Sequence, residues 1–61
     1  MNVQLVAILA AVAAAQARIA GMQSANAISI STGKGLAYEP DAFFLEANYL
    51  DRLSIEARNA Q

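Results

Sequence analysis

The stretch LVAILAAVAAAQARIAG, residues 5–21, decides the fold of this chain, because Gln16 and Arg18 are its only strongly polar residues. Leu and Ala favour the helix, and Asn2 precedes the stretch at a position where it can act as an N-cap. Gly21 and the polar residues that follow it weaken the helical tendency. The sequence therefore predicts a first helix over about residues 3–23.

The apolar residues of this helix recur at alternating spacings of three and four, which is the a/d pattern of packed helices. This heptad seam comprises Leu5, Ile8, Val12, Ala15, Ile19 and Met22. Beside it, Ala13, Ala17 and Gly21 form a ladder of small residues that would let another backbone approach closely. A helix that is apolar all round must be buried all round, in protein or in lipid. We expect neighbouring protein to cover it, so the ladder and the five larger residues of the seam, Leu5, Ile8, Val12, Ile19 and Met22, are interface candidates.

Two other interpretations of residues 5–21 are weaker. Ala15-Gln16-Ala17 fits a signal-peptidase site, but no Lys or Arg precedes the apolar segment, as a secretion signal requires. A membrane span needs about 20 apolar residues, whereas the uninterrupted run covers only residues 5–15. Arg18 near the centre of a span would cost about 2.5–3.5 kcal/mol. The alternative that stays open is a single-pass membrane protein with residues 3–22 in the bilayer.

The C-terminal segment predicts a second, amphipathic helix over about residues 41–60. Pro40 suits a first helical turn, and Asp41 adds a favourable negative charge there. One apolar stripe, spaced by three and four, comprises Phe43, Ala47, Leu50, Leu53 (or Ser54), Ala57 and Ala60. The charged residues expected largely off this stripe are Glu46, Asp51, Glu56 and Arg58. The helix has no glycine stop, so the sequence leaves open whether Gln61 is the natural end.

Phe44 and Tyr49 lie off the stripe that Phe43 and Leu50 lead. Large aromatic side chains are enriched among the residues that dominate protein interfaces. We therefore expect Phe44 and Tyr49 to be candidates for contacts between subunits.

The segment between the helices, ANAISISTGKG at residues 25–35, alternates isoleucine with serine before two glycines. Read alone, this pattern favours a short extended piece that runs into a Gly-Lys-Gly turn. The STGKG motif lacks the upstream glycine of a phosphate-binding loop, so we interpret it as an ordinary turn. The expected organisation is a hydrophobic Ala-rich helix in 1–24, a connector in 25–40 and an amphipathic helix in 41–61. The fold class is all-α.

Composition limits both stability and chemistry. The 61 residues include no Cys and no His, which excludes disulfides and the common zinc sites. A chain this small then needs association to be stable. Its four basic residues are too scattered for specific nucleic-acid binding, and its serines have no suitable base beside them. We expect no cofactor, no metal and no enzymatic activity.

The segments AQARIAGMQSANA, residues 15–27, and EANYLDRLSIEARNAQ, residues 46–61, are similar to the beginnings of internal virion (ejection) proteins of tailed bacteriophages. The resemblance rests on amino-acid composition and on the pattern of residues along the chain, and it assigns no role to any single residue. It implies a structural subunit that is packed near a portal or tail and leaves the capsid with the genome. We therefore expect a non-enzymatic assembly subunit of a virion, whose partners are copies of itself or other subunits. The alternative is a small accessory protein of the bacterial inner membrane, with direct membrane contact.

Overall fold

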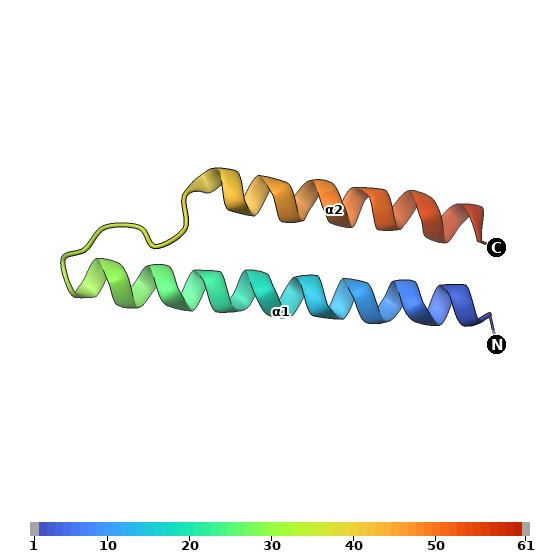
Figure 1. The fold of residues 1–61 in the computed structure, drawn as a ribbon, viewed down its shortest axis with the longest axis horizontal. Helices are drawn as coiled ribbons and strands as arrows, with labels where there is room; N and C mark the ends of the chain where they lie inside the picture. The colour runs from blue at the N-terminus through green and yellow to red at the C-terminus, as the bar shows by residue number, and fades with distance from the viewer. Residues whose placement is uncertain (1, 61) are drawn as a thin grey trace.

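The computed structural model describes residues 2–60, and these form a hairpin of two antiparallel helices (Figure 1). Helix α1 spans Val3–Ser31 and helix α2 spans Pro40–Asn59. The Cα trace measures 48 × 18 × 8 Å, so the molecule is long, narrow and only one layer thick. The expected all-α class, with two helices and a connector, is confirmed.

Helix α1 has well-formed caps at both ends. The Asn2 side chain accepts hydrogen bonds from the backbone N–H groups of Gln4 and Leu5, at 2.9 and 3.2 Å, as the sequence predicts. At the other end the Lys34 N–H donates to the Ser29 carbonyl and the Gly33 N–H to the Ile30 carbonyl. Gly33 has a φ of 77°, and this combination is a Schellman motif that satisfies the last carbonyls of the helix.

The predicted end of the first helix near residue 23 is wrong, because α1 continues for two more turns to Ser31. The extended piece expected in 25–31 is helical, and the connector covers 32–39 instead of 25–40. Asn26 and Ser29 extend the three-four spacing of the seam and are half-buried. The packing of this face therefore outweighs the local β preference of the isoleucines. Gly21 in the helix interior costs only about 1 kcal/mol, which a helix this long tolerates.

Helix α2 begins and ends within one residue of its predicted range. Pro40 lies at the first helical position and Asp41 in the first turn, where both are favourable. Arg58 lies in the last turn, where its positive charge complements the helix dipole. The expectation for this segment is confirmed.

The core is the line along which the two helices meet. The heptad seam of α1 faces this line: Ile8, Ala15 and Met22 are buried, and Leu5, Val12 and Ile19 are half-buried. From α2, Leu53 is the buried residue, with 5% of its surface exposed. The α2 stripe differs from the prediction at one turn, where Ala47 is exposed and Glu46 is half-buried in its place. Glu46 lies at the helix–helix boundary because Arg18 of α1 pairs with it there.

Candidate interaction surface

The side of α1 opposite its seam is uncovered. Its residues follow one another at spacings of three or four, so they form a continuous line along the helix. We call this line the back face; it comprises Val3, Val6, Ala10, Ala13, Ala17, Ala20, Ser24 and Ile28, all of them exposed. None of these side chains is charged. At 1.5 Å per residue, α1 is about 43 Å long, and the back face runs nearly its whole length.

The ten interface candidates from the sequence separate into different environments. The five that belong to the heptad seam face α2, namely Leu5, Ile8, Val12, Ile19 and Met22. Ala13, Ala17 and Gly21 are exposed, and a Cβ added at Gly21 would meet no heavy atom within 4 Å. The small-residue ladder is therefore exposed in the hairpin, and only Gly21 borders the space between the two helices.

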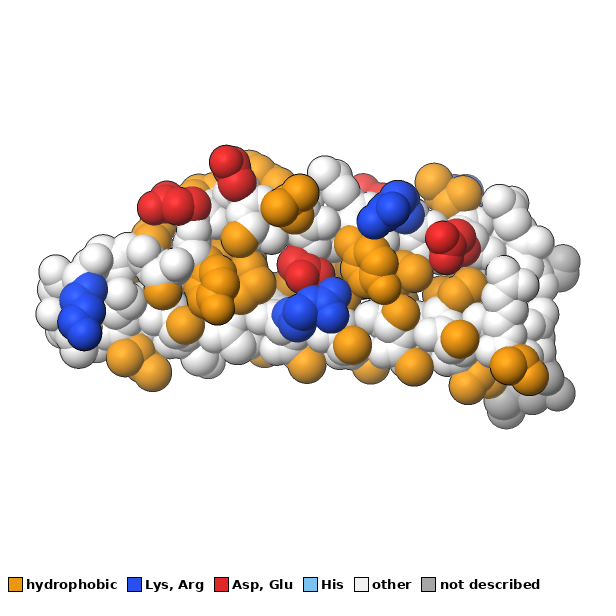
Figure 2. All heavy atoms as spheres, viewed as in Figure 1, with side chains coloured by type: hydrophobic (Ala, Val, Ile, Leu, Met, Phe, Trp, Pro, Cys, Tyr) orange, Lys and Arg blue, Asp and Glu red, His pale blue; other side chains and the backbone are white. Residues whose placement is uncertain are grey.

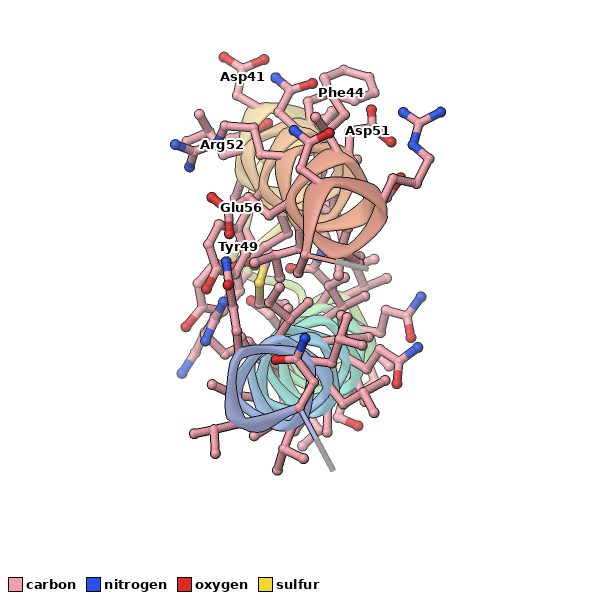
Figure 3. All side chains as sticks on the ribbon, turned by 90° about the vertical axis from the view of Figure 1, so that its right-hand side faces the viewer. Asp41, Phe44, Tyr49, Asp51, Arg52 and Glu56 are labelled. Carbon is pink, nitrogen blue, oxygen red and sulfur yellow. The ribbon has the colours of Figure 1, made fainter. Side chains whose placement is uncertain are left out.

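The two aromatic candidates also differ. Phe44 is 64% exposed and points away from α1 in the end-on view of Figure 3. The ring of Tyr49 instead lies between two guanidinium groups of the same chain, with its centroid 5.7 Å from Arg18 Cζ and 5.6 Å from Arg52 Cζ. These distances are in the range of cation–π contacts. Tyr49 thus packs within the hairpin, because Arg18 approaches it from α1.

An ion pair joins the helices near their middle. Arg18 Nε donates to Glu46 Oε1 at 2.8 Å, and Arg18 Nη2 donates to Glu46 Oε2 at 3.0 Å. The hydrogen bonds from the guanidinium lower the pKa of the Glu46 carboxyl below its ordinary value, and they raise the pKa of Arg18. Arg18 is the one charged residue in the sequence of α1. Because its charge is turned toward α2, the back face carries none.

Asparagine side chains fasten the hairpin at its two ends. Asn2 Nδ2 donates to the Ala60 carbonyl at 2.8 Å, which ties the start of α1 to the end of α2. Asn26 Nδ2 donates to the Tyr38 carbonyl at 3.0 Å, and the Tyr38 N–H donates to Asn26 Oδ1 at 2.7 Å. Neither contact is predictable from the sequence, because an asparagine gives no local sign of a backbone partner elsewhere in the chain.

A groove of about 570 Å³ opens between the helices on the connector side of the ion pair. Its lining is largely apolar and comprises Arg18, Gly21, Met22, Tyr38, Ala42 and Glu46. Across residues 2–60, no three Asp or Glu side chains lie close enough together to hold a metal ion.

Helix α2 carries four of the five acidic residues of the sequence, whereas α1 carries a single charged residue, Arg18. In Figure 2 the acidic groups lie on α2, whereas hydrophobic groups follow the edge of α1. Figure 3 shows Asp41 and Asp51 pointing away from α1, and the side chains beyond α1 on the opposite side are almost entirely carbon. The exposed surface of α2 therefore mixes charged residues with the exposed side chains of Phe44, Leu45 and Ile55, whereas the back face of α1 carries no charge.

Helix α1 is also long and apolar enough to cross a membrane, judged by length and composition. Its most apolar 18-residue window has a mean hydropathy of 1.8, and 17% of that window is buried. No family model matches the chain, and no curated protein or solved structure matches it either.

Proposed function

We propose that this chain is a non-enzymatic assembly subunit that packs against helices of neighbouring chains through the back face of α1. The observation that carries this proposal is the small buried share, 17%, of the most apolar window of α1. A contiguous apolar surface on a folded protein marks a site of interaction. Since α2 covers only one side of α1, the other side needs a second partner.

The total surface of the hairpin supports the same reading. It exposes 4464 Å², whereas a compact monomer of 6.4 kDa exposes about 3,800 Å². The excess reflects the elongated, single-layer shape of the hairpin, whose Cα trace measures 48 × 18 × 8 Å. This shape leaves the back face of α1 open to contact with neighbouring chains.

A membrane accessory protein is the second candidate, and the length and hydropathy of α1 favour it. The hairpin fold disfavours α1 as a membrane-spanning helix, because α2 lies alongside α1 over most of its length (Figure 1). With the hairpin intact, a spanning α1 would carry Asp51 and Arg52 to membrane depth, at about 2.5–3.5 kcal/mol for each charge. A spanning α1 without α2 would lose the Arg18–Glu46 pair and the burial of Leu53. Protein helices cover the back face without either cost.

The kind of assembly rests on the resemblance to internal virion proteins alone. That resemblance favours a bacteriophage particle, in which the hairpin would be one of the packed internal components. Mass spectrometry of purified particles would test this placement separately from the packing itself.

The packing is tested by enlarging the back face. The double variant Ala13→Leu, Ala17→Leu overpacks a close helix contact, and such overpacking costs about 1–3 kcal/mol per site. In extracts of expressing cells we expect the native chain to elute far above its monomer mass and the double variant to elute at smaller size. Ala47→Leu is the control for one such substitution, since it adds the same atoms per site at an exposed position of α2.

Identical elution of the native chain and the double variant would contradict the proposed packing. Carbonate extraction distinguishes the second candidate, because an integral membrane protein stays in the membrane fraction and a protein-packed subunit is released.

A further inference from the structure

The end of the hairpin that holds the connector exposes large apolar side chains. We call this end the tip and define it as residues 28–38, which form the last turn of α1 and most of the connector. In Figure 1 the tip lies at the opposite end of the molecule from both termini. Every large apolar side chain in the tip is between 42% and 65% exposed, namely those of Ile28, Ile30, Leu36 and Tyr38.

These side chains do not share one side of the hairpin. Ile28 and Ile30 are two positions apart on a helix that turns about 100° per residue, so they point about 200° apart around α1. A protein surface that lies against one side of α1 would cover one isoleucine and leave the other in water. A fluid lipid surface surrounds both when the tip enters it end-on. The arrangement therefore favours lipid over a flat protein partner.

The hydroxyl groups beside the isoleucines are turned onto the backbone. Ser31 Oγ donates to the Ile28 carbonyl at 2.8 Å. Thr32 Oγ1 lies within hydrogen-bond distance of the Ile28 and Ser29 carbonyls, at 3.1 and 3.0 Å. Unpaired hydroxyl and carbonyl groups are costly where water is scarce. The last turn of α1 thus exposes hydrocarbon and keeps these polar groups paired, which suits the boundary between lipid headgroups and acyl chains.

The charge at the tip is complementary to an anionic lipid surface. Lys34 is the one charged residue among positions 19–38, and it is exposed. All five acidic residues follow, between positions 39 and 56. Figure 2 shows a basic group at the connector end of the molecule, with the acidic groups farther back over α2. Lysine is attracted to anionic headgroups, and tyrosine is enriched at the membrane–water interface, where Tyr38 would lie.

We propose that the tip inserts end-on into the headgroup region of an anionic phospholipid bilayer, with Ile30 and Leu36 at the acyl boundary and Lys34 beside the phosphates. Interfacial anchors are buried by about 5–10 Å, so most of the 48 Å hairpin stays outside the bilayer. Such a contact goes beyond the proposed function, which places protein helices on the back face. It also differs from a membrane span, because α1 and α2 remain paired.

The chain has no Trp, so single tryptophans report which end of the hairpin meets lipid. The probe is a vesicle of phosphatidylglycerol and phosphatidylcholine in equal parts, mixed with the purified full chain. We expect the emission of Leu36→Trp to shift to the blue and that of Val3→Trp, an exposed position at the other end of α1, to stay unchanged. A shift of both variants would show that α1 lies in the bilayer along its length. That result would overturn the inference, as would a shift of Val3→Trp alone or of neither variant.

Vesicle flotation measures how much each side chain contributes. Leu36→Ser should lower the partition coefficient on the order of tenfold, through lost apolar burial. Leu45→Ser is the matched control, because Leu45 is exposed on α2 away from the tip, and it should bind as the native chain does. Lys34→Gln should weaken binding to the anionic vesicles about fivefold and leave binding to pure phosphatidylcholine unchanged. Circular dichroism shows that each variant keeps its helices.

Equal binding of Leu36→Ser and Leu45→Ser, or unchanged binding of Lys34→Gln, would overturn the inference. If the chain binds no vesicles while Leu36→Ser lowers its elution size in cell extracts, the tip contacts protein, so the inference fails and the proposed function stands. If the tip binds vesicles but Ala13→Leu, Ala17→Leu leaves the elution size unchanged, the inference stands and the proposed packing fails.

Discussion

The two helices are similar in regularity, but the sides that face away from the helix–helix contact differ in charge. Both are regular α-helices, and both contribute to one line of contact. The outer side of α2 carries charged residues such as Asp41 and Asp51, as is usual for a helix at a protein surface. The outer side of α1 carries none. Helix α2 buries its apolar stripe against α1, whereas α1 is apolar on two sides and only one of them is covered in the hairpin. The proposed function assigns the other side to a neighbouring chain.

The largest effect should come from the single contact line that the hairpin does supply. Leu53→Ala removes the buried leucine of α2, and such truncations cost about 2–5 kcal/mol. In urea titrations followed by circular dichroism, we expect this variant to lose its helical signal at a much lower urea concentration than the native chain. Leu45→Ala is the matched control, because Leu45 is 71% exposed and its loss should change stability by about 0.5 kcal/mol or less. Equal effects of the two substitutions would mean that the helices do not pack as described.

A pair of alanines sharpens the contrast between the two sides of α1. Ala15 on the seam is fully buried, whereas Ala17 on the back face is exposed. Ala15→Leu should destabilise the hairpin itself by about 1–3 kcal/mol through overpacking, even in dilute solution. Ala17→Leu should leave the dilute hairpin unchanged and weaken only its association. Thermal melts at several protein concentrations separate the two results. If Ala17→Leu lowered the melting temperature equally at all protein concentrations, Ala17 could not lie on the exposed back face.

The connector end is expected to show a smaller effect. Asn26→Ala removes both hydrogen bonds to the Tyr38 backbone, each worth about 0.5–1.5 kcal/mol. We expect faster amide hydrogen exchange of the Tyr38 N–H and of the last two turns of α1. Ser24→Ala, at an exposed position of the back face, should leave these exchange rates unchanged.

The smallest effect concerns the ion pair and appears as a pH dependence. Arg18 lowers the pKa of Glu46 from its ordinary value of 4.5, chiefly through hydrogen bonds. Since the folded pKa lies below the unfolded one, this stabilisation is complete well above pH 4.5 and is lost as pH falls through the folded pKa. The difference in melting temperature between the native chain and Glu46→Gln should therefore shrink below about pH 4.5. When Arg18 is replaced as well, in an Arg18→Gln background, the change in melting temperature caused by Glu46→Gln should also be smaller. A difference in melting temperature between the native chain and Glu46→Gln that grows at low pH would contradict the pairing.

Local patterns in the sequence were sufficient for much of the fold. The Asn2 cap, the start of α2 at Pro40, the glycine turn and the heptad seam of α1 depend on residues within one or two turns of each other. Such features follow from backbone sterics, propensity and periodicity, so they can be predicted without a three-dimensional model. The apolar character of both sides of α1 belongs to the same class.

The tertiary structure decided three features whose partners lie far along the chain. Helix α1 continues to Ser31 because its seam extends past residue 23 and Asn26 binds the Tyr38 backbone across the connector. Glu46 faces inward because Arg18, 28 positions away, neutralises it. Which side of α1 is left bare also depends on where α2 packs. A periodic pattern shows that a helix has two apolar sides, but only the packing of a second helix determines which of them is buried and which stays exposed.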